Sequence, residues 1–361
     1  MESASKTVTA VIPTYRRPRL LERAVKSVLA QTHRDVRVRI YDNASGDETE
    51  SVARRLAGDD RRVSYHCHAV NIGATKNFQF GMDDVSTPFF SCLSDDDVLF
   101  PGFYAEALAA FDAAPDTMMS IGSTLEFTPD GRFLYAPLAL WPRCGRFDPP
   151  GGAFAMLDNR HATWTGIVFR REVVEHVGSI DAEVGPPADL DFELRVACRY
   201  PFVVSFAPSA AYLNHASSVS AGEDASVIAG YRRIASKIAH DERLATDFRS
   251  RIAPLLQRQM RRKLIEIVVK GLCADNLEVA AHAAGRLSTD FAGSFEARTA
   301  VAAYRLCSTS RFARSVLRSI ERARLRLRAR RSEQGTRRHS GTSPADFVHY
   351  LTLTPGLDAQ R

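Results

Sequence analysis

Residues 89–101 read FFSCLSDDDVLFP, and this stretch indicates how the surrounding chain folds. The apolar run at its start is typical of a buried strand, and apolar residues resume directly after Asp95, Asp96 and Asp97. Pro101 and the glycine after it then open a helical pattern, FYAEALAAF. Three adjacent carboxylates at the carboxyl end of a strand repel one another unless a cation offsets their charge.

Two interpretations of the three acids are open. A helix N-terminus favours Asp as a cap and as a complement to the helix dipole, which accounts for one or two of the three. Carboxylate oxygens also suit Mg²⁺ or Mn²⁺, ions that usually bind phosphate groups as well. Because all three acids follow an apolar strand directly, we favour the metal-and-diphosphate interpretation.

The sequence before this stretch alternates strands with helices. Apolar runs predict strands over 7–13, 36–41 and 63–68, with amphipathic helical patterns between them. Short connections between such elements indicate an α/β fold with a doubly wound, mostly parallel sheet flanked by helices. Ligands of such sheets bind beyond the carboxyl ends of the strands. The residues expected at those ends are Tyr15, Asp42, Asn43, Asn71, Gly73 and Asp95 to Asp97.

The second half of the chain divides into a mixed region and a helical one. Strands are expected over 118–127, 164–170 and 203–207, helices over 172–177 and 189–199, and an irregular loop over 135–152. A C-terminal helical extension begins near residue 222. We expect a catalytic domain over 1–221 with halves at about 7–114 and 115–221, a helical region over 222–310, and a basic helix with a polar tail over 311–361. Residues 332–345 of that tail are predicted to be disordered.

The composition is that of a globular protein: 361 residues, 45% hydrophobic and 25% charged. The six cysteines are scattered without a CxxC pair, which favours reduced thiols. The N-terminus enters a strand pattern without a signal peptide, and no apolar run approaches the roughly 18 residues that a membrane span needs. We therefore expect a cytoplasmic protein.

The basic surplus of the chain is concentrated near its end. The net charge is +6, yet residues 311–340 alone contain eleven Arg against two Glu. A solvated helix is the simplest interpretation. Apolar residues interleave with Arg over 311–331, so peripheral contact with an anionic membrane is the second. Nucleic-acid binding is disfavoured because no recognised module accompanies the segment.

Seven stretches in order carry a resemblance to a known family. They are VIPTYRR at 11–17, QTHRDVRVRIYDNASGDET at 31–49, NIGATKNFQFG at 71–81, LSDDDVLFPG at 93–102, TGIVFRREVVEHVGSID at 165–181, DLDFELR at 189–195 and NHASSVS at 214–220. Over roughly residues 7–220 the chain resembles the family-2 glycosyltransferases, which have the GT-A fold. Ser94 stands where many members of that family have Asp.

The resemblance implies roles in binding the nucleotide-sugar. Asp42 would bind the base with Asn43 beside it, and Asp95 would lie on the ribose side. Asp96 would be the metal ligand, with Asp97 and His215 as further candidates, and the cofactor would be Mg²⁺ or Mn²⁺. The implied nucleotide-sugar site is made of Pro13, Tyr15, Arg16, Asp42, Asn43, Asn71, Gly73, Lys76 and Asp95.

The resemblance also implies a catalytic base. The Glu-Asp pair usual in the family reads Ala188-Asp189 here, so Asp189 would be the base and Asp191 a structural or alternative one. Inverting transfer needs such a base, a cation and a pocket that aligns both substrates. We therefore expect a metal-dependent, inverting transferase that uses a nucleotide-sugar, in first place a UDP-sugar. Its acceptor would be a glycan, a lipid-linked glycan or a small molecule, in polysaccharide, lipopolysaccharide or other glycoconjugate biosynthesis.

Two rival functions remain open at this point. A nucleotidyltransferase would usually have a Gly-rich loop after its first strand, and PTYRRPR contains no Gly. A catalytically silent nucleotide-sugar-binding or scaffold protein is compatible with Ala188 and Ser94. Local alternatives also exist: Asp42 and the turn at 71–73 could serve only as turn residues, and Asp189 only as a helix cap.

Overall fold

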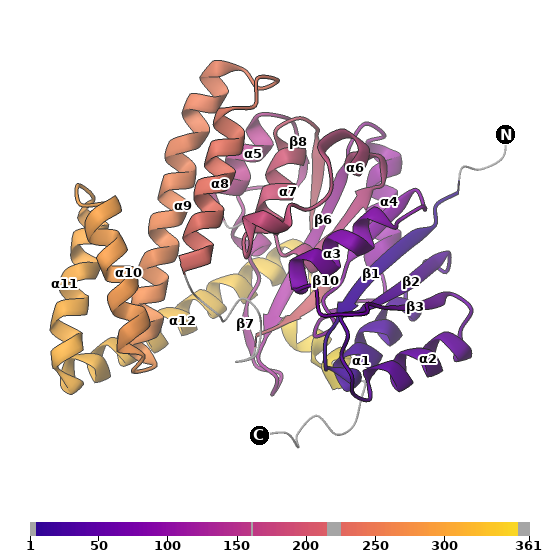
Figure 1. The fold of residues 1–361 in the computed structure, drawn as a ribbon, viewed down its shortest axis with the longest axis horizontal. Coiled ribbons are helices and arrows are strands. Elements are labelled where there is room, and N and C mark those ends of the chain that lie inside the picture. The colour runs from indigo at the N-terminus through magenta and orange to yellow at the C-terminus, as the bar shows by residue number, and fades with distance from the viewer. Residues whose placement is uncertain (1–4, 160–161, 215–224, 353–361) are drawn as a thin grey trace. The chain divides into compact units, whose positions relative to one another are not determined.

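The computed structural model describes residues 5–159, 162–214 and 225–352, and the chain forms two compact units. Unit 1 is drawn from Met1–Glu183, Ala188–Ala216 and Ala329–Arg361 (Figure 1). Unit 2 is drawn from Val184–Pro187 and Ser217–Arg328. His215, a predicted metal ligand, lies outside the described residues.

Unit 1 is built on a ten-stranded sheet. Eight of its strands follow the order β3-β2-β1-β4-β9-β6-β10-β5, and the other two pair at its side, β7 with β6 and β8 with β10. The first four strands of this order are parallel, whereas β9 is antiparallel to both of its neighbours. The strands are β1 (Val8–Thr14), β2 (Val36–Asp42), β3 (Val63–Cys67), β4 (Phe89–Cys92), β5 (Val98–Leu99), β6 (Met119–Phe127), β7 (Phe133–Tyr135), β8 (Gly145–Phe147), β9 (Ile167–Arg170) and β10 (Phe202–Leu213).

Helices cover both faces of the sheet, as the alternation of side chains along β1 requires. Val8, Ala10 and Ile12 share one core cluster with apolar residues of α1, α2 and α4. Val11 points to the opposite face, where Gly81 brings α3 close. The helices of this unit are α1 (Pro18–Leu29), α2 (Thr49–Asp59), α3 (Ala74–Asp83), α4 (Phe103–Ala113), α5 (Gly151–Asp158), α6 (Glu172–Val177) and α7 (Ala188–Ala197).

The predicted fold class is confirmed, and the differences are local. The stretch 135–152 is more ordered than the expected loop, since it contains β8 and the start of α5. The predicted strand 203–207 is part of the longer β10, although Pro208 cannot donate to a strand ladder. The pairing of β10 with β6 shifts register on both sides of Pro208, and this irregularity lets the strand continue past it.

Residues 332–345 are also ordered, so the prediction of disorder over this segment is wrong. Helix α12 runs over Arg311–Ser340, and a 3₁₀ segment follows over Pro344–Thr352. The Ser332 hydroxyl accepts from the backbone N–H of Ala136 at 2.6 Å and donates to its carbonyl at 3.0 Å. Phe347 packs on Phe100 with ring centroids 4.5 Å apart. The polar composition hid these contacts, because small hydroxyl side chains can satisfy a buried backbone.

Unit 2 contains α8 (Ala225–Ala239), α9 (Thr246–Cys273), α10 (Leu277–Asp290), α11 (Phe295–Thr309) and the first part of α12. Its core is formed mainly by apolar residues of α9 and α10, and Asn276 and Ser294 cap the N-termini of α10 and α11. None of the helices in the described ranges has the length and apolar character needed to cross a membrane.

Gly81→Ala should destabilise unit 1 by about 1–3 kcal/mol, because the new Cβ overpacks the contact between α3 and the sheet. That Cβ would overlap Cγ1 of Val11 and lie 2.9 Å from Cε2 of Tyr41. Gly58→Ala is the matched control, since nothing lies within 4 Å of its added Cβ. In urea unfolding, the free energy of unfolding of Gly58→Ala should equal that of the wild type or exceed it by up to about 1 kcal/mol. Equal stability of both variants would contradict the described packing of α3.

Candidate active site

Asp95, Asp96 and Asp97 form a turn between β4 and β5, at the carboxyl end of a central strand. All three are buried, with exposures of 5%, 7% and 0%. The N–H of Asp97 donates to the carbonyl of Ser94 at 3.1 Å and closes the turn. At the end of the neighbouring strand β1, Thr14 donates its hydroxyl to Oδ2 of Asp95 at 2.7 Å. The pairing of β1 with β4 therefore positions the turn.

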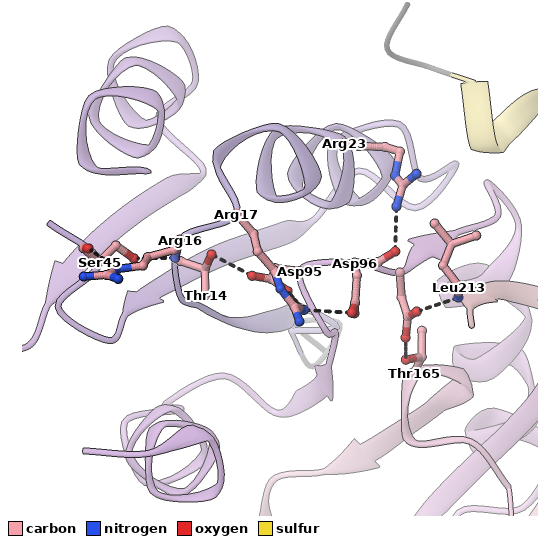
Figure 2. Close-up of polar contacts among 10 residues, drawn as sticks. Thr14, Arg16, Arg17, Arg23, Ser45, Asp95, Asp96, Thr165 and Leu213 are labelled. Carbon is pink, nitrogen blue, oxygen red and sulfur yellow. Dashed lines mark hydrogen bonds and ion pairs between the residues drawn. The ribbon is translucent and has the colours of Figure 1, made fainter. Parts of the chain in front are cut away.

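Arg17 supplies the positive charge that faces the turn. Its Nη1 lies 3.1 Å from Oδ1 of Asp95 and 2.8 Å from Oδ2 of Asp96 (Figure 2). Burial works against the charge of Arg17, but Asp95 and Asp96 raise its pKa. Burial and then Asp96 raise the pKa of Asp95 to about 6, against the opposing effect of Arg17. One arginine nitrogen thus counters two buried carboxylates.

Sequence reasoning missed Arg17, although a signal for it existed. Arg17 belongs to the loop after the first strand, and adjacent parallel strands bring their carboxyl ends to the same edge of the sheet. The order of the strands decides which loop meets the acids, and the local pattern does not contain that order. In the structure β1 lies next to β4, so the loop that contains Arg17 reaches the turn.

A second arginine holds the backbone of the turn. Arg23 of α1 is 1% exposed, and its Nη2 donates to the carbonyl of Asp96 at 2.6 Å. Its Nη1 donates to the carbonyl of Leu351 at 3.5 Å. Burial lowers the pKa of Arg23, while Asp97 and Asp96 act in the opposite direction. Arg23 therefore links the acidic turn to the C-terminal 3₁₀ segment.

The Asp97 carboxyl is engaged by Thr165 and Leu213 rather than by Arg17. Its Oδ2 accepts from the hydroxyl of Thr165, and its Oδ1 accepts from the N–H of Leu213 at 3.1 Å. Burial and then Asp96 raise the pKa of Asp97 well above its usual range. Among the described residues no three His, Cys, Asp or Glu side chains converge as a metal site. The structure therefore brings Asp95 and Asp96 together and turns Asp97 away.

The pair of Asp95 and Asp96 suits a divalent cation. Both carboxylates approach a single nitrogen of Arg17, so they already face one common point. Mg²⁺ and Mn²⁺ prefer such oxygen ligands, and Mg²⁺ usually binds one or two carboxylates together with substrate phosphates. The residues present therefore fit a cation shared with a diphosphate, and Arg17 would have to give way to it.

The predicted base-binding residue Asp42 is engaged within its own loop. It is 1% exposed, and its Oδ1 accepts from the N–H and the hydroxyl of Ser45 at 2.9 and 2.6 Å. Its Oδ2 accepts from the hydroxyl of Tyr65 at 2.9 Å. The Ser45 hydroxyl also accepts from the N–H of Arg16 at 2.8 Å. Asp42 thus shapes the turn as the local alternative proposed, and its contact with a base stays a prediction.

The remaining predicted nucleotide residues lie on connected loops. The side chain of Asn43 accepts from the N–H of Ile72 at 2.8 Å and donates to Oδ1 of Asn71 at 3.0 Å. Gly73, with a φ of 88°, precedes α3. These bonds join the loops after β2 and β3 into one rim at the carboxyl ends of the strands. Pro13 is buried, whereas Tyr15, Arg16 and Lys76 are exposed.

Helix α7 carries both predicted bases in different settings. Asp189 is half-buried in the first turn, where its Oδ1 accepts from the N–H of Leu190 at 2.7 Å. Asp191 is 2% exposed and pairs with Nε of Arg195 at 2.9 Å. Arg195 also donates to the carbonyl of Ser179 at 2.8 Å. Asp191 therefore serves the connection between α6 and α7, which agrees with its structural interpretation.

Glu193, on the same helix, was not identified from the sequence. Its side chain is 0% exposed, and neither carboxyl oxygen accepts a hydrogen bond from any described residue. Burial and then Asp189, one helical turn earlier, raise the pKa of Glu193 well above its usual range. Its signal in the sequence was a glutamate between Phe192 and Leu194, both of which are fully buried.

Both the sequence and the fold of the chain are similar to those of known glycosyltransferases. Residues 9–178 match the family model described as Glycosyl transferase family 2. Over 96 residues the chain is 35% identical to the GalNAc(5)-diNAcBac-PP-undecaprenol beta-1,3-glucosyltransferase of Campylobacter jejuni, covering 26% of this chain and 31% of that protein. It is 32% identical over 97 residues to an uncharacterized glycosyltransferase of Rickettsia prowazekii, covering 27% and 29%. Each match spans less than a third of the relative's length.

Solved structures share the fold at low identity. The crystal structure of S. aureus TarS 1–349 in complex with UDP-GlcNAc has a TM-score of 0.61 at 12% identity, covering 86% of this chain and 89% of that one. The same protein in complex with UDP gives 0.58 at 12% identity, covering 88% and 92%. The chain therefore has the GT-A fold, and its residues 9–178 are similar to glycosyltransferase family 2.

Glu193→Gln should stabilise the protein increasingly as the pH rises from 4 to 8. When folding raises the pKa of a carboxyl, the free energy of unfolding falls as the pH rises above the ordinary pKa of about 4.3. The reason is that the folded protein must then either bury a charge or hold on to the proton. Below that pH the wild type and the variant should unfold alike. Thermal melts across this range test the prediction, with Glu172→Gln, an exposed glutamate of α6, as the control. A difference from the wild type that does not change with pH would contradict the account of Glu193.

Proposed function

We propose that the chain is an inverting glycosyltransferase that moves a sugar from a nucleoside-diphosphate sugar to an acceptor hydroxyl. The observation that carries the proposal is the approach of Asp95 and Asp96 to one nitrogen of Arg17 beyond the end of β4. That arrangement supports a cation site at the edge where α/β sheets bind their ligands. A UDP-sugar is the proposed donor, with support from the TarS complexes with UDP-GlcNAc and UDP.

The proposed catalytic domain covers residues 1–221, with donor binding in 7–114 and acceptor binding in 115–221. Residues 222–310 would form a helical region and 311–361 a basic helix with its tail. The rim formed by the loops after β1, β2 and β3 would hold the nucleotide. Its proposed contacts are Pro13, Tyr15, Arg16, Asp42, Asn43, Asn71, Gly73, Lys76 and Asp95.

Asp95 and Asp96 would hold Mg²⁺ or Mn²⁺, which neutralises charge that builds on the departing diphosphate. Thr14 and Arg23 keep the carboxylates in place from two sides, through the Asp95 side chain and the Asp96 carbonyl. The Asp97 carboxyl accepts two hydrogen bonds from the protein. Its proposed contribution is therefore to support the turn rather than to ligate directly.

Asp189 is the proposed base that removes the proton from the acceptor hydroxyl. Half-burial leaves its carboxyl accessible to a substrate while lowering the local polarity, a setting in which a carboxylate can act as a base. Asp191 is the weaker candidate, because Arg195 binds its carboxyl and burial limits its access.

The proposed acceptor is a lipid-linked glycan, as in the name of the Campylobacter jejuni relative. Growing polysaccharide, lipopolysaccharide and small molecules are the other acceptors compatible with the proposal. The reaction would take place in the cytoplasm, at the inner face of the membrane. Nucleic acid has no part in it.

Asp189→Asn should lower turnover at least about 100-fold, because an amide cannot accept the acceptor proton. Binding of the donor should persist. Turnover is measured as UDP released from a panel of UDP-sugars with lipid-linked acceptors, and binding as the rise in melting temperature with UDP and Mn²⁺. Asp130→Asn, at an exposed turn between β6 and β7, is the matched control and should behave like the wild type.

Each rival function gives a different result in these assays. Unchanged turnover in Asp189→Asn would refute the proposed base. A protein that UDP, GDP and dTDP all fail to stabilise would be a scaffold rather than a transferase. Release of pyrophosphate from a nucleoside triphosphate and a sugar phosphate would identify a nucleotidyltransferase.

A further inference from the structure

Large apolar side chains are exposed mainly on two helices of unit 2. Of the eleven large apolar side chains that are exposed among the described residues, seven belong to α11 or α12. Single exposed apolar residues are ordinary on a protein surface, whereas a concentration of them marks an interaction site. The grouping of exposed apolar side chains on α11 and α12 therefore indicates an interaction surface.

Four of these side chains form an apolar stripe along α12. Phe312, Val316, Ile320 and Leu327 are exposed by 79%, 42%, 59% and 56%. At 3.6 residues per turn the four positions fall within an arc of about 80° around the helix. Leu325 is exposed by 45% but lies outside this arc by its spacing. The stripe is narrow and continuous over four turns, as in helices that lie on a surface.

The opposite side of α12 is fixed against the rest of unit 2. Ala313 and Leu317 pack against its apolar core. Arg314 and Arg318 both pair with Asp275, at 2.8 and 2.6 Å. These contacts determine which side of the helix turns inward, and they leave the apolar stripe on the outside.

Exposed arginines flank the apolar stripe between Ile320 and Leu327. Arg322 and Arg326 lie on one edge and Arg324 on the other, by their spacing along the helix. Arg324 pairs with Glu321 at 2.6 Å. Within the part of the chain that the structure describes, Arg322 and Arg326 form no ion pair. Their positive charges therefore lie beside the stripe without an acidic partner.

We infer that the apolar stripe of α12 docks unit 2 on an anionic lipid surface. Apolar side chains between exposed arginines fit the boundary between acyl chains and negative headgroups. A second copy fits less well, since pairing the same surface in two copies brings like charges together. A nucleic acid would bind the arginines but leave the apolar side chains in water. The inference rests on the proposed function in one respect: docking on the membrane would hold the transferase near a lipid-linked acceptor.

The test is sedimentation of the full-length protein with vesicles. Phosphatidylcholine vesicles containing about 30% phosphatidylglycerol should bind it, and pure phosphatidylcholine vesicles should bind it at least about tenfold more weakly. Phe312→Ser with Ile320→Ser should weaken binding to the anionic vesicles about tenfold by removing apolar area. Arg322→Gln with Arg326→Gln should weaken it as well, and about 0.5 M salt should abolish the part that depends on charge.

Leu325→Ser is the matched control, because it removes an exposed leucine of the same helix outside the stripe. It should bind vesicles like the wild type. Melting temperature and stabilisation by UDP should be unchanged in every variant, which separates a failure of docking from a failure of the proposed transfer. Unchanged vesicle binding after removal of Phe312 and Ile320 would overturn the inference. Equal binding to neutral vesicles would overturn it too. The inference would also be wrong if the Phe312 and Ile320 variant lost dimerisation or DNA binding but still bound vesicles.

Discussion

The repulsion between two buried, adjacent carboxylates is the constraint on which the acidic turn after β4 depends. Asp95 and Asp96 are almost fully buried, and charges in such a place need a counter-charge. In the described structure Nη1 of Arg17 approaches both carboxylates. A cation that binds with a nucleotide would meet the same need. A positive charge would then face the two carboxylates in both the ligand-free and the ligand-bound form.

Much of the surrounding structure holds this pair in place. Thr14 fixes the side chain of Asp95 from β1, and Arg23 fixes the carbonyl of Asp96 from α1. Arg23 also reaches the carbonyl of Leu351, so the last described residues of the chain support the acidic turn. Asp97 ties the turn to Thr165 and to Leu213 of β10. Segments far apart in the sequence therefore cooperate to hold two carboxyl groups.

The sequence predicted what local pattern can specify and missed what depends on contact in three dimensions. The apolar run before Asp95 predicted a strand that ends in an acidic turn, and the alternation before it predicted the sheet. The partners Arg17 and Arg23 were missed, because the strand order decides which loop and which helix meet the turn. Two further features depend on packing: the Asp97 carboxyl is bound by Thr165 and Leu213, and the buried Glu193 carboxyl accepts no hydrogen bond from the described residues. The order of residues 332–345 was missed because polar composition says nothing of a buried serine such as Ser332.

The central claim is that Asp95 and Asp96 bind a nucleoside diphosphate through a divalent cation. Calorimetric titration of UDP into the wild type, once with Mn²⁺ and once with EDTA, tests it most directly. The account predicts binding at least about tenfold tighter with Mn²⁺, a gain that Asp96→Asn should lose. Equal affinity for UDP in Mn²⁺ and in EDTA would contradict it, and the two carboxylates would then take part in UDP binding without a divalent cation.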